Sequence, residues 1–165
     1  MSILTSPVID FIKVSTEFCR FLEQEQLPER AEFCRVMRGL LPMIYLKATL
    51  IDLPERESDG YNPAAVTEQD YDFIRGRVSR VMGGNDDFLD TFVEDFKFSE
   101  TPVLCTISEN LADIYQQLRD MAEICRDGDE ESIAVALHDV HDDFPEWGQK
   151  LLNALRALHD VNYGI

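Results

Sequence analysis

Hydrophobic side chains recur at steps of three and four residues along most of this chain, which is the spacing of one face of an α-helix. The first such pattern begins at Ser6 and Pro7, residues that favour a helix start, and runs to about residue 26. A second extends from Pro28 to about Ile51 and contains Pro42, so it predicts a helix that is kinked or split there. The pattern is typical of an α-helical protein.

Three further helices follow from the same periodicity. Thr67 with Asp70 resembles a capping box, and Gly83 suits the end of the helix that this box opens. Hydrophobic residues then recur from residue 107 to 125 and again from 133 to 158. The last stretch keeps its phase through Pro145, which predicts one helix kinked near that proline. The chain is expected to form a single all-α domain over residues 1–165, a helical bundle of about five to seven helices.

The segment from residue 85 to 96 combines acidic and aromatic residues, with Phe88, Phe92 and Phe96 about one helical turn apart. This spacing predicts a short amphipathic helix, followed by a loop from residue 97 to 106. Three aromatic rings on one helix face suit docking into an apolar groove of a partner. The same rings could instead cover one open end of the protein's own bundle, and the sequence leaves both interpretations open.

Charge narrows the range of partners. The chain has 15 basic and 32 acidic residues, a formal net charge of −17, and 45% of its residues are hydrophobic. The hydrophobic content is that of a folded protein, whereas the negative charge repels nucleic-acid phosphates and anionic lipid surfaces. We therefore expect neither a nucleic-acid nor a membrane partner.

The cysteines favour a reducing compartment. Cys19, Cys34, Cys105 and Cys125 show neither a CxxC pair nor the spacing of a zinc finger, so free thiols are expected. The first residues lack the basic and apolar regions of a secretory signal, and no apolar run approaches the roughly 18 residues that span a bilayer. These features predict a cytoplasmic protein.

The stretch from residue 136 to 149, ALHDVHDDFPEWGQ, contains a candidate for chemistry. His138, His141 and Asp142 are metal-ligand residue types and could support a metal-assisted hydrolase. On a helical wheel, however, His138 and Asp142 share a face directed to solvent, and a further ligand would have to come from elsewhere. A solvated polar face beside the kink is the simpler interpretation, and no cofactor is expected.

A regular polar edge accompanies the hydrophobic stripe of the helix that begins near residue 107. Its members step by four and three residues: Glu109, Asp113, Gln116, Asp120, Glu123 and Asp127. Such an edge is either a solvated face or one wall of a groove for a polar ligand or a basic partner. Asp113 and Asp120 are the candidate partner-binding residues on it.

Four segments of the sequence resemble a known family: EFCRFLE, LLPMIYLKATL, SENLADIYQQLRD and WGQKLLNALRALH. They are similar to a family of small, acidic, all-helical bacterial proteins that is classed as a domain of unknown function. The segments are spread over essentially the whole chain, so the resemblance implies an all-helical fold throughout. It implies no activity, cofactor or catalytic residue.

A non-enzymatic protein-interaction or scaffold module, whose partner is another protein or a second copy of the chain, is the leading functional hypothesis. It rests on the acidic edge, on the aromatic segment and on the lack of a recognisable catalytic motif in the sequence. A metal-assisted hydrolase that uses the His138, His141 and Asp142 cluster is the first alternative. An acidic mimic of nucleic acid is the second, and only the net charge favours it.

Overall fold

Six α-helices and a small β-hairpin make up the part of the chain that the structure, a computed structural model, describes: residues 2–90 and 103–164. In chain order the elements are α1 (Ser6–Glu23), α2 (Arg30–Thr49), α3 (Glu68–Met82), the 3₁₀ turn η1 (Gly83–Asn85), β1 (Asp87–Asp90), β2 (Val103–Thr106), α4 (Ile107–Asp127), α5 (Glu130–Asp142) and α6 (Phe144–Tyr163). The predicted all-α class is confirmed, because the only sheet among the described residues has two short strands.

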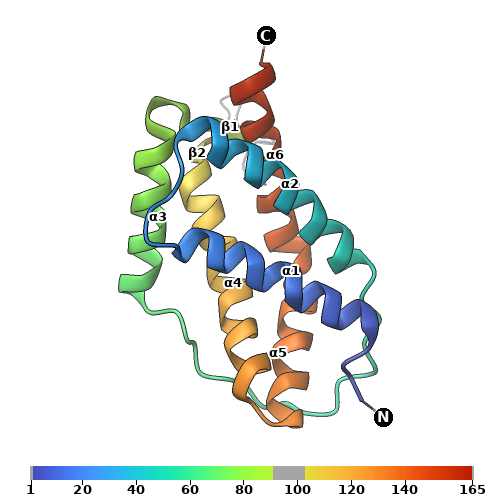
Figure 1. The fold of residues 1–165 in the computed structure, drawn as a ribbon. Helices are drawn as coiled ribbons and strands as arrows, with labels where there is room; N and C mark the ends of the chain where they lie inside the picture. Colours follow the sequence, from blue (N-terminus) through green and yellow to red (C-terminus); the bar gives the residue numbers. More distant parts are fainter. Residues whose placement is uncertain (1, 91–102, 165) are drawn as a thin grey trace.

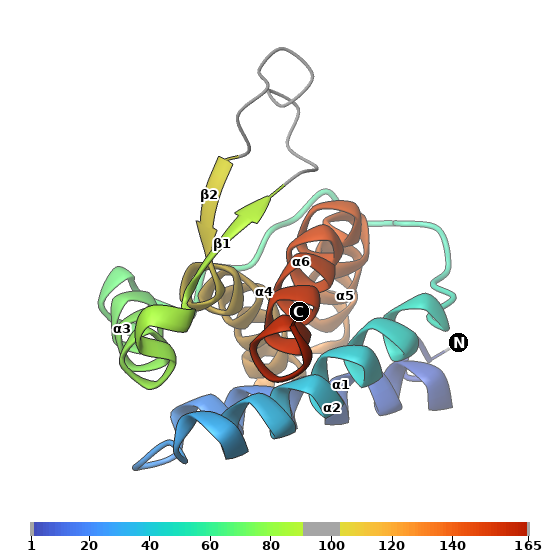
Figure 2. The same cartoon turned by 90° about the horizontal axis from the view of Figure 1, so that it is seen from above.

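The helices form two layers. α1 and α2 lie side by side in one layer, and α3, α4 and the α5–α6 pair form the other (Figures 1 and 2). α4 is central to the second layer, because it contacts α1, α3, α5 and α6. The apolar stripes meet between the layers, and burial of each large side chain there contributes about 1.5–3 kcal/mol. The largest of the fully buried side chains include Phe11, Phe18, Phe33, Met37, Leu41, Leu111, Ile114 and Leu118.

α2 runs without interruption through Pro42, so the predicted alternative of a split helix is wrong. The proline ring is exposed, whereas Leu41 and Ile44 on either side of it are fully buried. Core packing on both sides of the proline therefore holds the helix together, even though the proline lacks a backbone N–H and disfavours a helix interior.

The helix predicted for residues 85 to 96 is wrong where the structure describes it. Residues 87 to 90 instead form β1, which pairs antiparallel with β2 in the region predicted to be a loop, and Phe88 lies opposite Cys105. Asp86 explains the difference. Its carboxylate accepts hydrogen bonds from the backbone N–H of Ser108 at 2.8 Å and from the Ser108 hydroxyl at 2.6 Å, so it holds this segment against the start of α4.

The C-terminal segment, predicted to be one helix kinked near Pro145, instead forms two helices, α5 and α6, with Asp143 as the single residue between them. The backbone groups around this joint are satisfied. The N–H of Asp143 donates to the carbonyl of Asp139 at 3.0 Å, and the Asp143 carbonyl accepts from Trp147 at 3.1 Å. The Trp147 indole also donates to the carbonyl of Val140 at 2.8 Å, which ties α6 to α5.

Within residues 2–90 and 103–164, no helix is both long enough and apolar enough to cross a bilayer.

Candidate functional site: an acidic groove beside a polar strap

Residues 51 to 66 form a long irregular connection between α2 and α3, which we call the strap (Figure 1). Connections of this length without secondary structure are uncommon in compact domains. Polar contacts hold the strap to α5: Arg56 pairs with Asp139 at 2.9 Å and with Asp142 at 3.1 Å, and the Asn62 amide donates to the carbonyl of Ser132 at 2.9 Å. The strap therefore covers a side of α5 that the sequence pattern leaves open to solvent.

A groove of about 410 Å³ lies where the strap, α4 and α5 meet. Its acidic lining residues are Asp113 and Asp120 from α4, Asp139 from α5, and Asp143 at the joint. Gln116, Gln117 and Asn62 add amide groups. The structure thus brings the two predicted partner-binding aspartates together with two others that the sequence analysis did not single out as partner-binding. The sequence signal for Asp139 and Asp143 is their spacing of four residues.

Asp113 sits at the α6 side of the groove with two partners. The Tyr71 hydroxyl donates to one of its oxygens at 2.6 Å, and the Lys150 ammonium contacts the other at 2.9 Å. Burial and the hydrogen bond to Asp113 both raise the pKa of Tyr71, so this tyrosine stays a donor at physiological pH. Asp113 therefore ties α4 to both α3 and α6 while it lines the groove.

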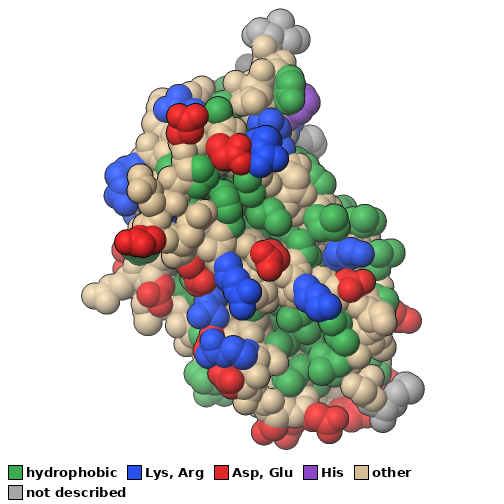
Figure 3. Space-filling model, viewed as in Figure 1, with side chains coloured by type: hydrophobic (Ala, Val, Ile, Leu, Met, Phe, Trp, Pro, Cys, Tyr) green, Lys and Arg blue, Asp and Glu red, His purple; other side chains and the backbone are tan. Residues whose placement is uncertain are grey.

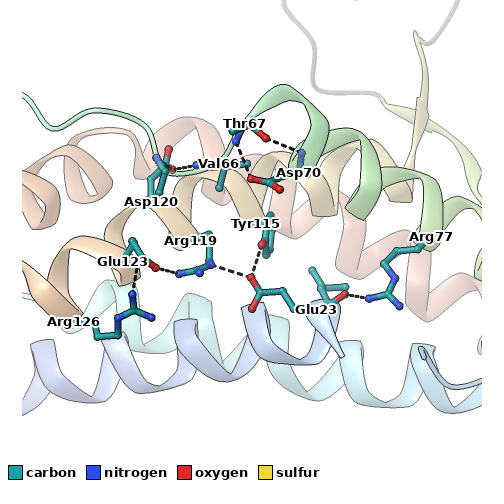
Figure 4. Close-up of polar contacts among 12 residues, drawn as sticks. Glu23, Val66, Thr67, Asp70, Arg77, Tyr115, Arg119, Asp120, Glu123 and Arg126 are labelled. Atoms are coloured by element: carbon teal, nitrogen blue, oxygen red, sulfur yellow. Dashed lines mark hydrogen bonds and ion pairs between the residues drawn. The ribbon is translucent and has the colours of Figure 1, made fainter. Parts of the chain in front are cut away.

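Asp120 anchors the strap where the strap meets α3. One of its carboxylate oxygens, Oδ1, accepts hydrogen bonds from the backbone N–H groups of Ala65 and Val66, each at 2.8 Å (Figure 4). The next residues form the predicted capping box, in which Thr67 and Asp70 each accept from the other's backbone N–H. Burial raises the pKa of Asp120, and the two backbone donors oppose that rise.

A second polar cluster joins α1 to α4 next to the groove. The Glu23 carboxylate accepts hydrogen bonds from the Tyr115 hydroxyl and from Arg119, and Arg119 also pairs with Glu123 (Figure 4). Glu123 in turn pairs with Arg126. The two carboxylates and two guanidinium groups balance in charge, so this cluster fits a structural role in joining the two layers.

The three metal-ligand candidates occupy different environments. His138 is buried, with an exposed fraction of 8%, whereas His141 is exposed and Asp142 is paired with Arg56. The expectation that His138 faces solvent is therefore wrong: it lies in the segment of α5 along which the strap packs, where Arg56 pairs with Asp139 and Asp142. In residues 2–90 and 103–164, no group of three or more His, Cys, Asp or Glu side chains is arranged to hold a metal ion. The metal-assisted hydrolase hypothesis gains no support from these positions.

The aromatic candidates lie only partly within the described residues. Phe88 is half-buried on β1 and packs against the hydrophobic core, which matches the interpretation that the ring covers the protein's own bundle. Its neighbour Leu89, directly opposite Leu104, is exposed instead. Phe92 and Phe96 lie outside the described residues.

The fold and its polar sites define an all-helical, two-layer domain with an acceptor-rich groove. A family model described as "Domain of unknown function (DUF5063)" matches residues 2–164, so the chain belongs to this family. The resemblance seen in the sequence segments is confirmed.

A solved structure supports the same fold over nearly the whole chain. The crystal structure of protein BF1032 from Bacteroides fragilis, a structural genomics target, is similar to it with 34% sequence identity and a TM-score of 0.86. The match covers 99% of this chain and 96% of that chain. No curated protein matches the chain.

Proposed function

We propose that this protein is a non-enzymatic interaction module that binds a basic segment of a partner protein in the acidic groove. The observation that supports this most directly is the distribution of charge. α4, α5 and the strap together carry 13 acidic and three basic side chains, whereas α1 and α2 carry four acidic and six basic ones. The negative charge is thus concentrated on the elements that build the groove.

The chemistry of the groove lining also favours a cationic ligand. Carboxylates and amide carbonyls accept hydrogen bonds, and ammonium and guanidinium groups donate them without accepting any. Asp120 and Asp143 each use only one carboxylate oxygen within the described residues: Asp120 for the strap backbone, and Asp143 for the amide of Gln117 at 3.0 Å. The second oxygen of each remains available to a lysine or arginine of a partner.

Peptide binding with a charge-matched control tests the proposal. Fluorescence anisotropy would measure the affinity of a labelled hexa-arginine peptide for the wild type, for Asp120→Asn/Asp143→Asn and for Glu17→Gln/Asp160→Asn. Both double variants lower the net negative charge by the same amount. The asparagines can still accept from the strap and from Gln117, so the fold is retained.

The Asp120→Asn/Asp143→Asn variant loses two partly exposed ion pairs with the peptide, each contributing about 0.5–1 kcal/mol. Peptide binding should therefore weaken roughly fivefold or more. The control variant, Glu17→Gln/Asp160→Asn, should lose less than twofold in affinity for the peptide. Raising sodium chloride from 25 to 150 mM should weaken binding further, because salt screens exposed charges. Equal losses in the two variants would mean non-specific attraction to an acidic protein and would refute the proposal.

A further inference from the structure

The outer face of α1 and α2 carries an exposed apolar stripe that is not part of the acidic groove. Met43 and Leu46 on α2 and Leu50 just after its last residue have exposed fractions of 46%, 52% and 52%. They lie on the side of the helix opposite the core positions. Ile9 on α1 and Leu4 just before it are also exposed large hydrophobic residues. Figure 3 shows hydrophobic side chains gathered over these two helices, with basic and acidic side chains interspersed beside them.

We propose that this face is a self-association surface, whose occupant is the same face of a second copy of the chain. The spacing of Met43, Leu46 and Leu50 is three and then four residues, which is the spacing of a seam between two packed helices. In a two-fold symmetric dimer the same patch meets itself, so an apolar stripe on one copy buries an apolar stripe on the other. The inference stands independently of the groove.

Charge singles out this face for a second copy. Two chains that each carry a net charge of −17 repel one another, and the repulsion is strongest when their acidic sides approach. The α1–α2 layer has more basic than acidic side chains. Ion pairs already present on its surface, such as Lys47 with Asp10 at 3.7 Å, keep both signs mixed there. It is the layer on which two copies repel least.

The size of the face suits a dimer. At about 1.5 Å per residue, α1 and α2 are roughly 27 and 30 Å long, and two such helices side by side present a face roughly 20 Å wide. The flat area of that face is about 600 Å², and the accessible area of its protruding side chains is larger. Stable interfaces bury about 800 Å² per partner, so the α1–α2 face is of comparable size.

Molecular mass in solution tests the inference directly. Sedimentation equilibrium of the full chain at 25 and 500 mM sodium chloride should give twice the chain mass of 18.9 kDa at high protein concentration. The dissociation constant should fall as salt rises, because screening weakens the repulsion between the two copies. Leu46→Glu should raise that constant at least tenfold. Leu152→Glu, at an exposed leucine on α6, is the control and should leave it within twofold.

Circular dichroism melting of each variant separates lost association from lost folding. If Leu46→Glu fails to fold, Met43→Gln/Leu50→Gln takes its place with the same expected loss of dimer. A wild type that is monomeric at both salt concentrations would overturn the inference. Equal weakening by the control variant would overturn it, and so would a dimer that dissociates as salt rises. Sedimentation of the wild type with phosphatidylcholine vesicles, abolished by Leu46→Glu, would assign the face to a lipid surface instead.

Discussion

Arg77 provides the sharpest test of how α3 is fastened to the other layer. Its side chain is buried at an exposed fraction of 8%, and its guanidinium faces the C-terminal end of α1 (Figure 4). Nη1 donates to the carbonyls of Leu22 at 2.6 Å and Gln24 at 2.7 Å, and Nη2 donates to that of Glu25 at 3.1 Å. One cation thus satisfies three carbonyls at the end of α1, where intrahelical donors run out.

The cost of Arg77→Ala follows from these contacts. The hydrogen bond to Leu22 is buried, and a carbonyl left there without a donor costs about 1–3 kcal/mol. The other two carbonyls can turn to water, so each adds about 0.5 kcal/mol. Loss of the cation stacked 4.8 Å from the Phe73 ring adds about 0.5–1 kcal/mol. Burial lowers the pKa of Arg77, which reflects the cost of desolvating the cation and offsets part of the sum. We expect a net loss of about 3 kcal/mol.

Urea denaturation followed by circular dichroism at 222 nm would measure this loss, and the melting temperature should fall by about 6–12 °C for a chain of this size. Arg77→Lys should recover only part of the stability, because an ammonium cannot span three carbonyls as a guanidinium fork does. Arg80→Ala is the matched control, since Arg80 is exposed on the same helix, and its effect should stay within about 0.5 kcal/mol. A loss below about 1 kcal/mol for Arg77→Ala, or full stability for Arg77→Lys, would refute the reasoning.

Three further predictions follow from buried polar groups. Asp86→Ala should cost about 2–4 kcal/mol in urea denaturation, because it leaves the buried Ser108 N–H and hydroxyl without their shared acceptor, and Asp86→Asn should recover part of this. Trp147→Phe keeps the ring but removes the donor to the Val140 carbonyl across the helix joint, so it should cost about 1–2 kcal/mol in the same assay. Burial raises the pKa of the Cys125 thiol to about 11. Its rate of alkylation by iodoacetamide, followed by peptide mass spectrometry, should therefore rise about tenfold per pH unit between pH 7 and 10. A rate that does not change with pH would contradict the raised pKa.

The helices were predictable because the feature that marks each of them, the spacing of its apolar residues, is local in the sequence. A helix that packs on a core must place apolar residues every three or four positions, and the stripes of α1, α2 and α4 all do so. Capping is local as well, which is why Thr67 and Asp70 could be identified as the start of α3. The two strands of the hairpin have no local sequence pattern of this kind. Phe88 fits a helical spacing equally well, and what selects a strand is the contact of Asp86 with Ser108, 22 positions further along the chain.

The candidate site shows the same division between local and long-range information. Asp113 and Asp120 were found because they belong to one regularly spaced helix edge. The packing of the strap along α5 could not be found in this way, because Arg56 contacts Asp139 across 83 positions of sequence. A helical wheel treats every side that lacks an apolar stripe as solvent, and it fails wherever an irregular segment covers such a side.

The two proposed surfaces belong to different layers of the fold, and this arrangement has a consequence for binding strength. Figure 2 shows the strap passing on the side of α4 and α5 that is turned away from α1 and α2. A dimer joined through the α1–α2 faces therefore leaves both acidic grooves open, facing outward. A partner with two basic segments could then occupy both grooves, and the second binding event would gain from a raised effective concentration.

Salt acts on the two surfaces in opposite directions: it strengthens the contact between like-charged copies and weakens the contact with a basic partner. Bivalent binding should accordingly be strongest at an intermediate ionic strength, where dimer formation and groove binding coexist.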